Sequence, residues 1–516
     1  MNDRRDVLKG LAAAGGSALL PGVLRVASPP PLPDYPFRLG VASGYPTGHS
    51  VVLWTRLAPQ PEQPGGGMAP QDRKVGYEVA ADEAFRHIVA RGEATAESLF
   101  AHSVHQQVAG LAPARDYWYR FTAGDHRSPI GRTRTLPAPR DELATLRLAA
   151  ACCQNYEHAS YAALRHMAAD APDLILYLGD YIYEGAPTTS HLRRHSGGRC
   201  ITLEDYRQRY AQYQLDPALQ AAHLAAPWFA IWDDHEVQND YAGDLPNLQE
   251  DVPGFAARRA AAYQAWYEHL PAPPSMAPRH GGMRIYWRAQ LGRLATLHLL
   301  DQRQYRSPEA CPRPPLLAGL RVKPDCSERL DPARTMLGTA QEQWLADGLR
   351  QPGAAWTLIA QGTPFGHMNE GTAAQPEYWT DGWTGYPAAR QRLLDSIREA
   401  GARNPVILGG DIHAFVVGGV NQVPERLDTP LLAAEFVTTS ISSDSVGQAT
   451  LDKWRAASPQ LQCLDGRRRG YLALTLAPER LRADLVTVDD AARADSARSS
   501  AGSYIVEAGN PAILPA

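Results

Sequence analysis

The stretch LILYLGDYIYE begins as an apolar run that stops abruptly at Gly179, and Asp180 and Tyr183 follow three residues apart. Both side chains can reach one metal ion if the chain turns just after a buried strand. A phenol is an unusual metal ligand, but it becomes a good one when a hard trivalent cation such as Fe³⁺ lowers its pKa. The plainer alternative is a capping aspartate beside a packed tyrosine.

A second stretch, WDDHEVQND at residues 232–240, gathers acidic, histidine and amide side chains directly after the apolar residues WFAIW. Burying several carboxylates together is costly unless cations neutralise them, which favours a metal cluster over a solvated acidic loop. His235 stands next to a candidate ligand and is suited to proton transfer to a leaving group.

Two further motifs carry residue types that bind metals. In GGDIHAF, Asp411 and His413 occupy alternate positions, so in an extended segment both face the same side. In CCQNY, Cys153 could supply a thiolate, which suits a transition metal rather than Ca²⁺ or Mg²⁺. A disulfide or a small buried side chain would also explain this cysteine.

The motif LDQRQYR places Arg303 and Arg306 shortly after Asp301. An arginine that points into a metal site would bind phosphate oxygens with two parallel hydrogen bonds. A structural salt bridge explains each arginine equally well.

These residues stand where predicted strands end. Six apolar runs each finish on a polar residue able to bind a metal or a substrate: LRLAAA, DLILYL, WFAIW, LATLHLL, WTLIA and PVILGG. The runs alternate with helical stretches such as 160–171 and 254–270, which is typical of an α/β domain. Ligands bind outside the carboxyl ends of strands in such sheets, so we expect one site there. Helix capping explains one such ending but not six.

The remaining organisation follows from length and composition. A chain of 516 residues is too long for one core, and residues 36–139 read as short β-strands separated by turns, which predicts an N-terminal β-sandwich. Residues 132–142 resemble a linker, so the α/β domain is expected over 142–516. The formal net charge of −4 argues against a nucleic-acid-binding protein.

The N-terminus predicts export. Arg4 and Arg5 precede a weakly apolar, glycine-containing stretch and then small residues, which is typical of a twin-arginine signal over residues 1–27. This predicts passage through the twin-arginine translocase and a periplasmic or secreted bacterial protein. An amphipathic N-terminal helix is the alternative. In an exported chain, Cys311 and Cys326, which flank a proline-rich loop, are the best candidate disulfide pair.

The motif order CCQNY, GDYIYE, WDDHEVQND, LDQRQYR, GGDIHAF and DGRRRGY resembles the PhoD-like alkaline phosphatase and phospholipase D family over nearly the whole chain. The resemblance implies a calcineurin-like metallophosphoesterase domain, an αββα sandwich, behind a small fibronectin-like β-sandwich. Asp234 then stands where the second metal motif has a ligand. Cys153 and Gln154 replace the leading motif of the generic fold.

The resemblance also implies a mechanism. The residues that hold Fe³⁺ are Cys153, Asp180, Tyr183 and His413, and those that hold Ca²⁺ are Asp180, Asp234 and Asp411. The metals activate a hydroxide and clamp the oxygens of a phosphate ester, either a monoester or a diester. His235 stabilises or protonates the leaving group, and Arg303 neutralises developing charge.

Two other functions stay open. A phosphodiesterase of the phospholipase D kind would use the same site on lipids or wall polymers, with access controlled by loops such as 185–200 and 363–383. A protein of another class, an exported surface- or carbohydrate-binding protein with structural metals, would bind through the aromatic residues of PEYWTDGWTGY.

Overall fold

Two large β-sheets form the framework of the protein in the computed structural model, which describes residues 32, 34–189, 192–351 and 353–516. The predicted export signal, residues 1–27, lies outside the described residues. Within them, no helix is both long and apolar enough to cross a membrane.

The first sheet has ten strands, and its centre is parallel. β9 (Leu146–Ala151), β10 (Leu174–Leu178) and β11 (Trp228–Ile231) run in the same direction, which brings their carboxyl ends to one edge. Antiparallel strands extend the sheet beyond β9, and these are β21 (Gly470–Leu476), β22 (Arg480–Val488), β23 (Arg498–Glu507) and β24 (Asn510–Pro515).

The second sheet has seven strands in the order β12-β13-β15-β17-β19-β18-β20. Its parallel core consists of β13 (Ala295–Leu299), β15 (Trp356–Ala360), β17 (Pro405–Gly409) and β19 (Leu431–Val437). The antiparallel strands are β12 (Trp287–Leu291), β18 (Phe415–Asn421) and β20 (Leu461–Asp465).

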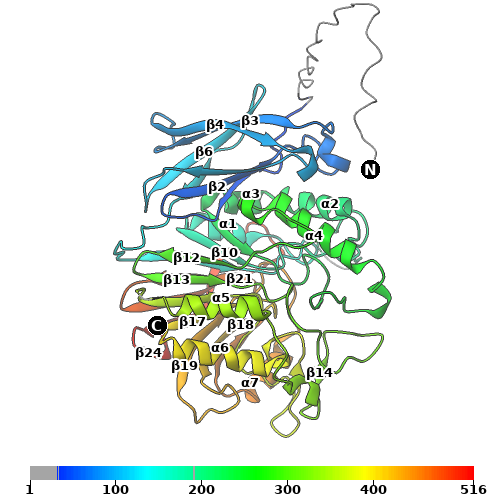
Figure 1. The fold of residues 1–516 in the computed structure, drawn as a ribbon, viewed down its shortest axis with the longest axis vertical. Helices are drawn as coiled ribbons and strands as arrows, with labels where there is room; N and C mark the ends of the chain where they lie inside the picture. The colour runs from blue at the N-terminus through cyan, green and yellow to red at the C-terminus, as the bar shows by residue number, and fades with distance from the viewer. Residues whose placement is uncertain (1–31, 33, 190–191, 352) are drawn as a thin grey trace, which may run out of the picture. The chain divides into compact units, whose positions relative to one another are not determined.

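Alternate residues of the second sheet face two different cores, as expected for strands buried on both sides. Leu358 of β15 packs in the core shared with the first sheet, whereas the next residue, Ile359, packs under α5 (Thr339–Leu349) and α6 (Pro387–Glu399). These two helices lie side by side over the sheet (Figure 1). On the first sheet, α1 (Ala162–Ala169) and α3 (Pro217–Ala225) pack together, as do α2 (Leu203–Gln214) and α4 (Phe255–His269). The predicted αββα sandwich is confirmed.

The N-terminal part is rich in strands, as predicted, and its two sheets enclose a separate apolar core. One sheet contains β4 (Ile88–Ala96), β3 (Arg73–Ala80), β6 (Asp116–Ala123), β7 (His126–Arg127) and β8 (Gly131–Arg134). The other contains β1 (Val41–Gly44), β2 (Ser50–Arg56) and β5 (Ser103–Ala109).

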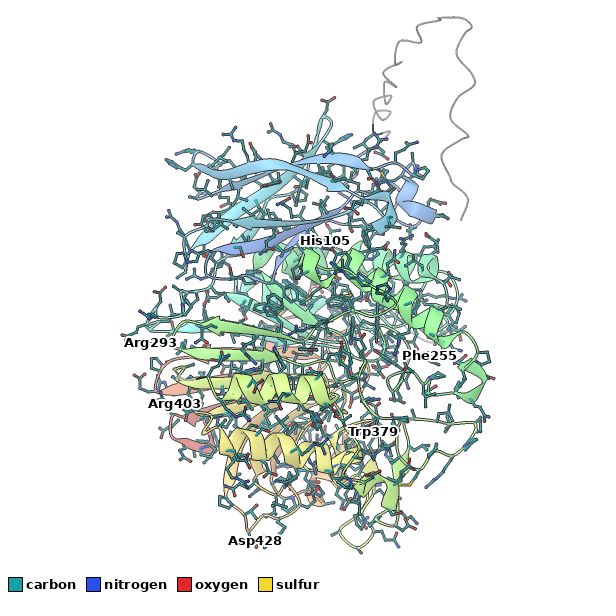
Figure 2. All side chains as sticks on the ribbon, viewed as in Figure 1. His105, Phe255, Arg293, Trp379, Arg403 and Asp428 are labelled. Carbon is teal, nitrogen blue, oxygen red and sulfur yellow. A yellow bond between two sulfur atoms is a disulfide. The ribbon has the colours of Figure 1, made fainter. Side chains whose placement is uncertain are left out.

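β1, β2 and β5 are themselves the outer three strands of the ten-stranded sheet, because Gly44 of β1 pairs with Trp228 of β11 in parallel. His105 of β5, labelled in Figure 2, adds a second tie: its Nδ1 lies 2.9 Å from the carbonyl oxygen of Ala272, and its ring stacks on Tyr267. The sandwich is therefore joined to the α/β framework by backbone and side-chain contacts in addition to the linker.

A long connection between β13 and α5 forms an arm beside the second sheet. The predicted disulfide between Cys311 and Cys326 is present in it. The arm contributes β14 (Arg321–Val322), which pairs with β16 (Tyr378–Trp379). The last helix of the chain, α7 (Gln448–Ala456), precedes β20.

Candidate metal centre

Four loops that follow parallel or central strands bring the predicted ligands together. Cys153 follows β9, Asp180 follows β10, Asp234 follows β11, and Asp411 follows β17. Because the carboxyl ends of these strands meet at one edge of the two sheets, residues far apart in the chain come within reach of a shared ion.

The first cluster contains Cys153, Asp180 and His413, which offer one ligand atom each within 4.8 Å of one another. Tyr183 completes it. The Tyr183 hydroxyl donates to Asp180 Oδ2 at 3.0 Å and lies 2.9 Å from His413 Nε2. The four residues predicted to hold Fe³⁺ therefore lie together in the structure.

The second cluster is built on Asp234. This residue groups with Asp180 and His235, and separately with Asp233 and Asp411, again with candidate ligand atoms within 4.8 Å. Asp411 Oδ2 is buried and has no hydrogen-bond partner in the described residues. Asp180 thus belongs to both clusters, which is the position that a carboxylate bridging two cations requires.

The pKa shifts of the acidic residues indicate an excess of negative charge in the two clusters. Burial, followed by the charges of neighbouring carboxylates, raises the pKa of Asp180 and of Asp411 well above its usual range. For Asp234, burial raises the pKa, but the charges of His235 and Arg303 lower it by more, so the pKa lies below its usual value. Carboxylates gathered in this way are stabilised by cations, so their chemistry fits a site for one or more metal ions.

Several of these residues adopt strained backbone conformations. Cys153, Asp180, Asp411 and His413 have positive φ angles of 58°, 58°, 71° and 56°, in a region that side chains other than glycine rarely occupy. Such strain persists where the surrounding structure enforces it, and it clusters at functional sites. Gly179 allows the chain to pass close to Asp233, because a Cβ at position 179 would lie 2.4 Å from Asp233 Cβ.

Two residues that the sequence analysis did not select hold the loops in place. The carboxylate of Glu236 accepts hydrogen bonds from the backbone N–H groups of Asp180, Tyr181 and Asp233 and so ties two ligand loops together. Ser443 Oγ donates to the Tyr183 hydroxyl at 2.8 Å. Glu236 stands inside WDDHEVQND, so its acidic side chain was a visible signal. Ser443 lies in a loop without a comparable pattern.

His235 lies at the edge of the clusters, half-buried and oriented by an acid. Its Nδ1 is 2.8 Å from Glu184 Oε2, while Nε2 makes no hydrogen bond within the described residues. Burial lowers the pKa of His235, but the carboxylates of Asp234, Glu184 and Asp180 raise it by more, to well above its usual value. The contact with Glu184 thus fixes the orientation of the ring. Glu184, the last residue of LILYLGDYIYE, was not predicted to have this role.

Arg303 lies behind the clusters, fully buried. Its Nε donates to Asp233 Oδ1 at 2.5 Å, and its two terminal nitrogens donate to the carboxylate of Asp381 at 2.5 and 2.8 Å. Its Nη2 lies 4.0 Å from Asp234 Oδ2. Arg306 also pairs with Asp381. This is the arrangement of a structural ion pair, the alternative that the sequence left open for Arg303.

A cavity of about 190 Å³ opens above the clusters. Its floor contains candidate ligands and His235, and its walls come from other parts of the chain. The residues that line it are Asp180, Asp234, His235, Asn239, Asp240, Arg321, Glu370, Trp379, Asp411, Ile412, His413, Val446 and Trp454. The site can therefore admit a small substrate directly above the acidic cluster.

Comparisons with known proteins agree with this architecture. The sequence model of the PhoD-like phosphatase matches residues 148–485, and that of the PhoD-like phosphatase N-terminal domain matches residues 25–137. Alkaline phosphatase D of Bacillus subtilis (strain 168) is 41% identical over 519 residues, which cover 98% of this chain and 88% of the relative.

Solved structures show the same fold. A structure of PhoD has a TM-score of 0.90 and 42% identity, and the match covers 94% of this chain and 93% of that one. Purple acid phosphatase PPD1 from yellow lupin (Lupinus luteus) seeds has a TM-score of 0.58 at 12% identity, covering 92% of this chain and 75% of that one.

The two-sheet framework with acidic loops at its strand ends defines a metallophosphoesterase fold. Within that class, the chain belongs to the PhoD-like phosphatase family. The family, the fold class and the enzyme class predicted from the motif order are thereby confirmed.

Proposed function

We propose that this protein is an exported, metal-dependent alkaline phosphatase that hydrolyses phosphate esters in the cavity above Asp180. The observation that carries the proposal is the shared position of Asp180 in two ligand clusters, next to the unpartnered buried oxygen of Asp411. Family membership gives the reaction class.

The donor sets fit two different cations. Cys153, Asp180, Tyr183 and His413 offer a thiolate, a phenolate and an imidazole beside a carboxylate, a set suited to Fe³⁺. Asp234 shares one group of candidate ligands with Asp180 and another with Asp411, and these three carboxylates offer only oxygen, which suits a hard divalent cation such as Ca²⁺. When bound, the two cations would supply Lewis acidity toward water and toward phosphate oxygens.

The chain's own residues supply proton transfer and orientation. His235 is held by Glu184 through Nδ1, so Nε2 is free to donate a proton to a departing alcohol. Asn239 and Asp240 lie in the wall of the same cavity. Arg303 keeps Asp233 in place behind Asp234 and so acts on the cluster indirectly.

The proposal includes the route of export, namely passage of the chain through the twin-arginine translocase to the periplasm or the medium. It is supported by the pair Arg4 and Arg5 and the stretch that follows them. Replacing both arginines with lysine should keep the protein in the cytoplasm, as fractionation and immunoblotting would show. Unchanged export of that variant would disprove the route.

The activity is tested by metal analysis together with a substrate panel. The wild type should contain iron and calcium and should hydrolyse p-nitrophenyl phosphate, bis-p-nitrophenyl phosphate or both. A preference for the diester would favour the phospholipase D kind of activity on lipids or wall polymers.

Asp411→Asn should lose calcium and activity. The control is Asp428→Asn, since Asp428 is an exposed residue paired with Arg426. A wild type that hydrolyses neither ester after loading with both metals would contradict the proposal.

A further inference from the structure

The cavity has two chemically different ends. We call the lining formed by the candidate ligands Asp180, Asp234 and Asp411 the floor. We call the lining formed by Trp379, Trp454 and Arg321, with Glu370 paired to Arg321, the rim. If the phosphate binds at the floor, as proposed above, the alcohol part of the ester has to extend toward the rim. The rim therefore decides which alcohols fit.

Arg321 is held in place before any substrate arrives. It lies on β14, where it pairs with Trp379 of β16. The preceding residue, Leu320, donates from its N–H to Thr380 Oγ1 at 2.9 Å and accepts from the Thr380 N–H at 2.8 Å. The arm around β14 is closed by the Cys311–Cys326 disulfide, and Cys326 packs with Leu320 in one small apolar cluster. A binding group fixed in this way loses little entropy when a ligand binds.

Packing against an apolar cluster holds the two tryptophans in place. Trp454 of α7 is buried in an apolar cluster with Ile412, and Trp379, labelled in Figure 2, packs against that cluster. Ile412 lies between Asp411 and His413 in the chain, so the rim and the floor share one support.

The terminal nitrogens of Arg321 are available to donate hydrogen bonds to a ligand. Its Nε donates to Glu370 Oε2 at 2.6 Å, and its guanidinium lies 5.4 Å from the Trp454 ring. The side chain is 44% exposed, and neither terminal nitrogen makes a hydrogen bond within the described residues. Arg303, in contrast, is buried and its donors are taken by carboxylates. Arg321 is thus the arginine that lines the cavity with two unused N–H₂ groups.

We propose that Arg321 is a specificity-determining residue that binds a second anionic group, located on the alcohol part of the substrate. The proposal rests on the phosphatase function stated above and narrows it to phosphate esters whose alcohol bears a carboxylate or a further phosphate. A planar guanidinium binds either anion through two parallel N–H donors. Trp379 and Trp454 contact the carbon skeleton that links this anion to the scissile phosphate.

The test uses two substrates that differ in one charge: 4-carboxyphenyl phosphate and its methyl ester, 4-(methoxycarbonyl)phenyl phosphate. The value of kcat/KM is measured for both with the wild type, Arg321→Gln and Arg321→Lys. The intrinsic reactivity of each substrate is the same for all variants, so it cancels when the two substrates are compared across variants.

Arg321→Gln should lower kcat/KM for the carboxylate substrate about 10- to 100-fold, the usual range for losing a hydrogen-bonded ion pair. It should change the methyl ester less than about 3-fold. Arg321→Lys should recover part of the loss, because it keeps the charge but not the paired donors. The matched control, Arg426→Gln, removes an exposed arginine outside the cavity and should change neither substrate.

Three results would overturn the inference. An equal loss on both substrates would place Arg321 on the scissile phosphate or in a purely structural role. An unchanged kcat/KM for both substrates would show that Arg321 does not bind the substrate. Full activity of Arg321→Gln with the carboxylate substrate and a loss with the ester alone would reverse the proposed preference. If the wild type cleaves neither substrate nor any other ester, the proposed function itself fails, which is a distinguishable outcome. Metal content and melting temperature of each variant show whether it is folded.

Discussion

Replacing Arg303 with methionine should weaken the folded state itself, because this arginine holds buried acids together. Its guanidinium bonds to Asp233 and Asp381, and all three side chains are at most 1% exposed. Methionine keeps much of the volume and removes the charge, so the variant isolates the loss of the ion pairs.

The magnitude follows from which acids lose their partners. Breaking a buried ion pair by removing one member costs about 3–5 kcal/mol. Asp381 keeps Arg306, whereas within the described residues the carboxylate of Asp233 keeps only a hydrogen bond from Gln302 Nε2 at 3.2 Å. One acid out of two is left poorly compensated, so we expect the lower end, about 3 kcal/mol. For a chain of this length the melting temperature should fall by about 3 °C.

Thermal and urea unfolding of the metal-loaded enzyme measure this effect. The double variant Arg303→Met, Asp233→Asn removes both charges of the pair and should regain at least half of the loss. Arg350→Met is the control, since Arg350 forms an exposed pair with Asp347 and should change stability by less than about 0.5 kcal/mol. The reasoning is refuted if Arg303→Met unfolds like the wild type while kcat/KM drops about 100-fold, because that pattern belongs to a residue that contacts the phosphate.

Other substitutions separate ligation, catalysis and pH response. Tyr183→Phe should lose or strongly shift a visible absorption band of the iron-loaded protein, and a colourless, active wild type would contradict the ferric site. Asp180→Asn should lose metal, activity and stability together. His235→Ala should keep its metal and lose about 10²–10⁴ in turnover. Loss of metal from His235→Ala would instead show that His235 is a metal ligand. Burial lowers the pKa of His223 and of His298 to about 3, so the unfolded chain binds more protons below pH 6.5. Stability should fall as pH drops from about 6.5, by about 2 kcal/mol per histidine at pH 5, and His298→Gln should flatten this fall in the urea midpoint.

The elements that position the site were predictable because each has a local signature. Buried parallel strands are apolar on both faces, so runs such as DLILYL stand out, and β10 covers Leu174–Leu178 within that run. A candidate ligand that closely follows such a strand, for example Asp180, is then placed by chain connectivity alone. The domain organisation was less visible, since the pairing of β1 with β11 joins residues 184 positions apart (Gly44 with Trp228).

The contacts that tune the site were not predictable in the same way. Glu184 and His235 are 51 residues apart, and Arg303 and Asp381 are 78 apart, so their pairing depends on how separate loops pack. Arg321 lies on a strand of two residues, which is too short to show any periodicity. Side chains that act across loops leave no pattern in one sequence, whereas those at strand ends do.

The distribution of charge is uneven between the two sides of the site. Two buried arginines, Arg303 and Arg306, compensate the acids on the side of Asp381, where burial raises the carboxyl pKa but the two guanidiniums lower it by more. On the cavity side, Asp180 and Asp411 form no ion pair with an arginine within the described residues, and their pKa is raised. A lysine or arginine placed there would neutralise them but would fill the space above the floor. Metal ions would supply the same charge and leave coordination positions for the substrate, so the excess of negative charge is on the face where we expect the phosphate to bind.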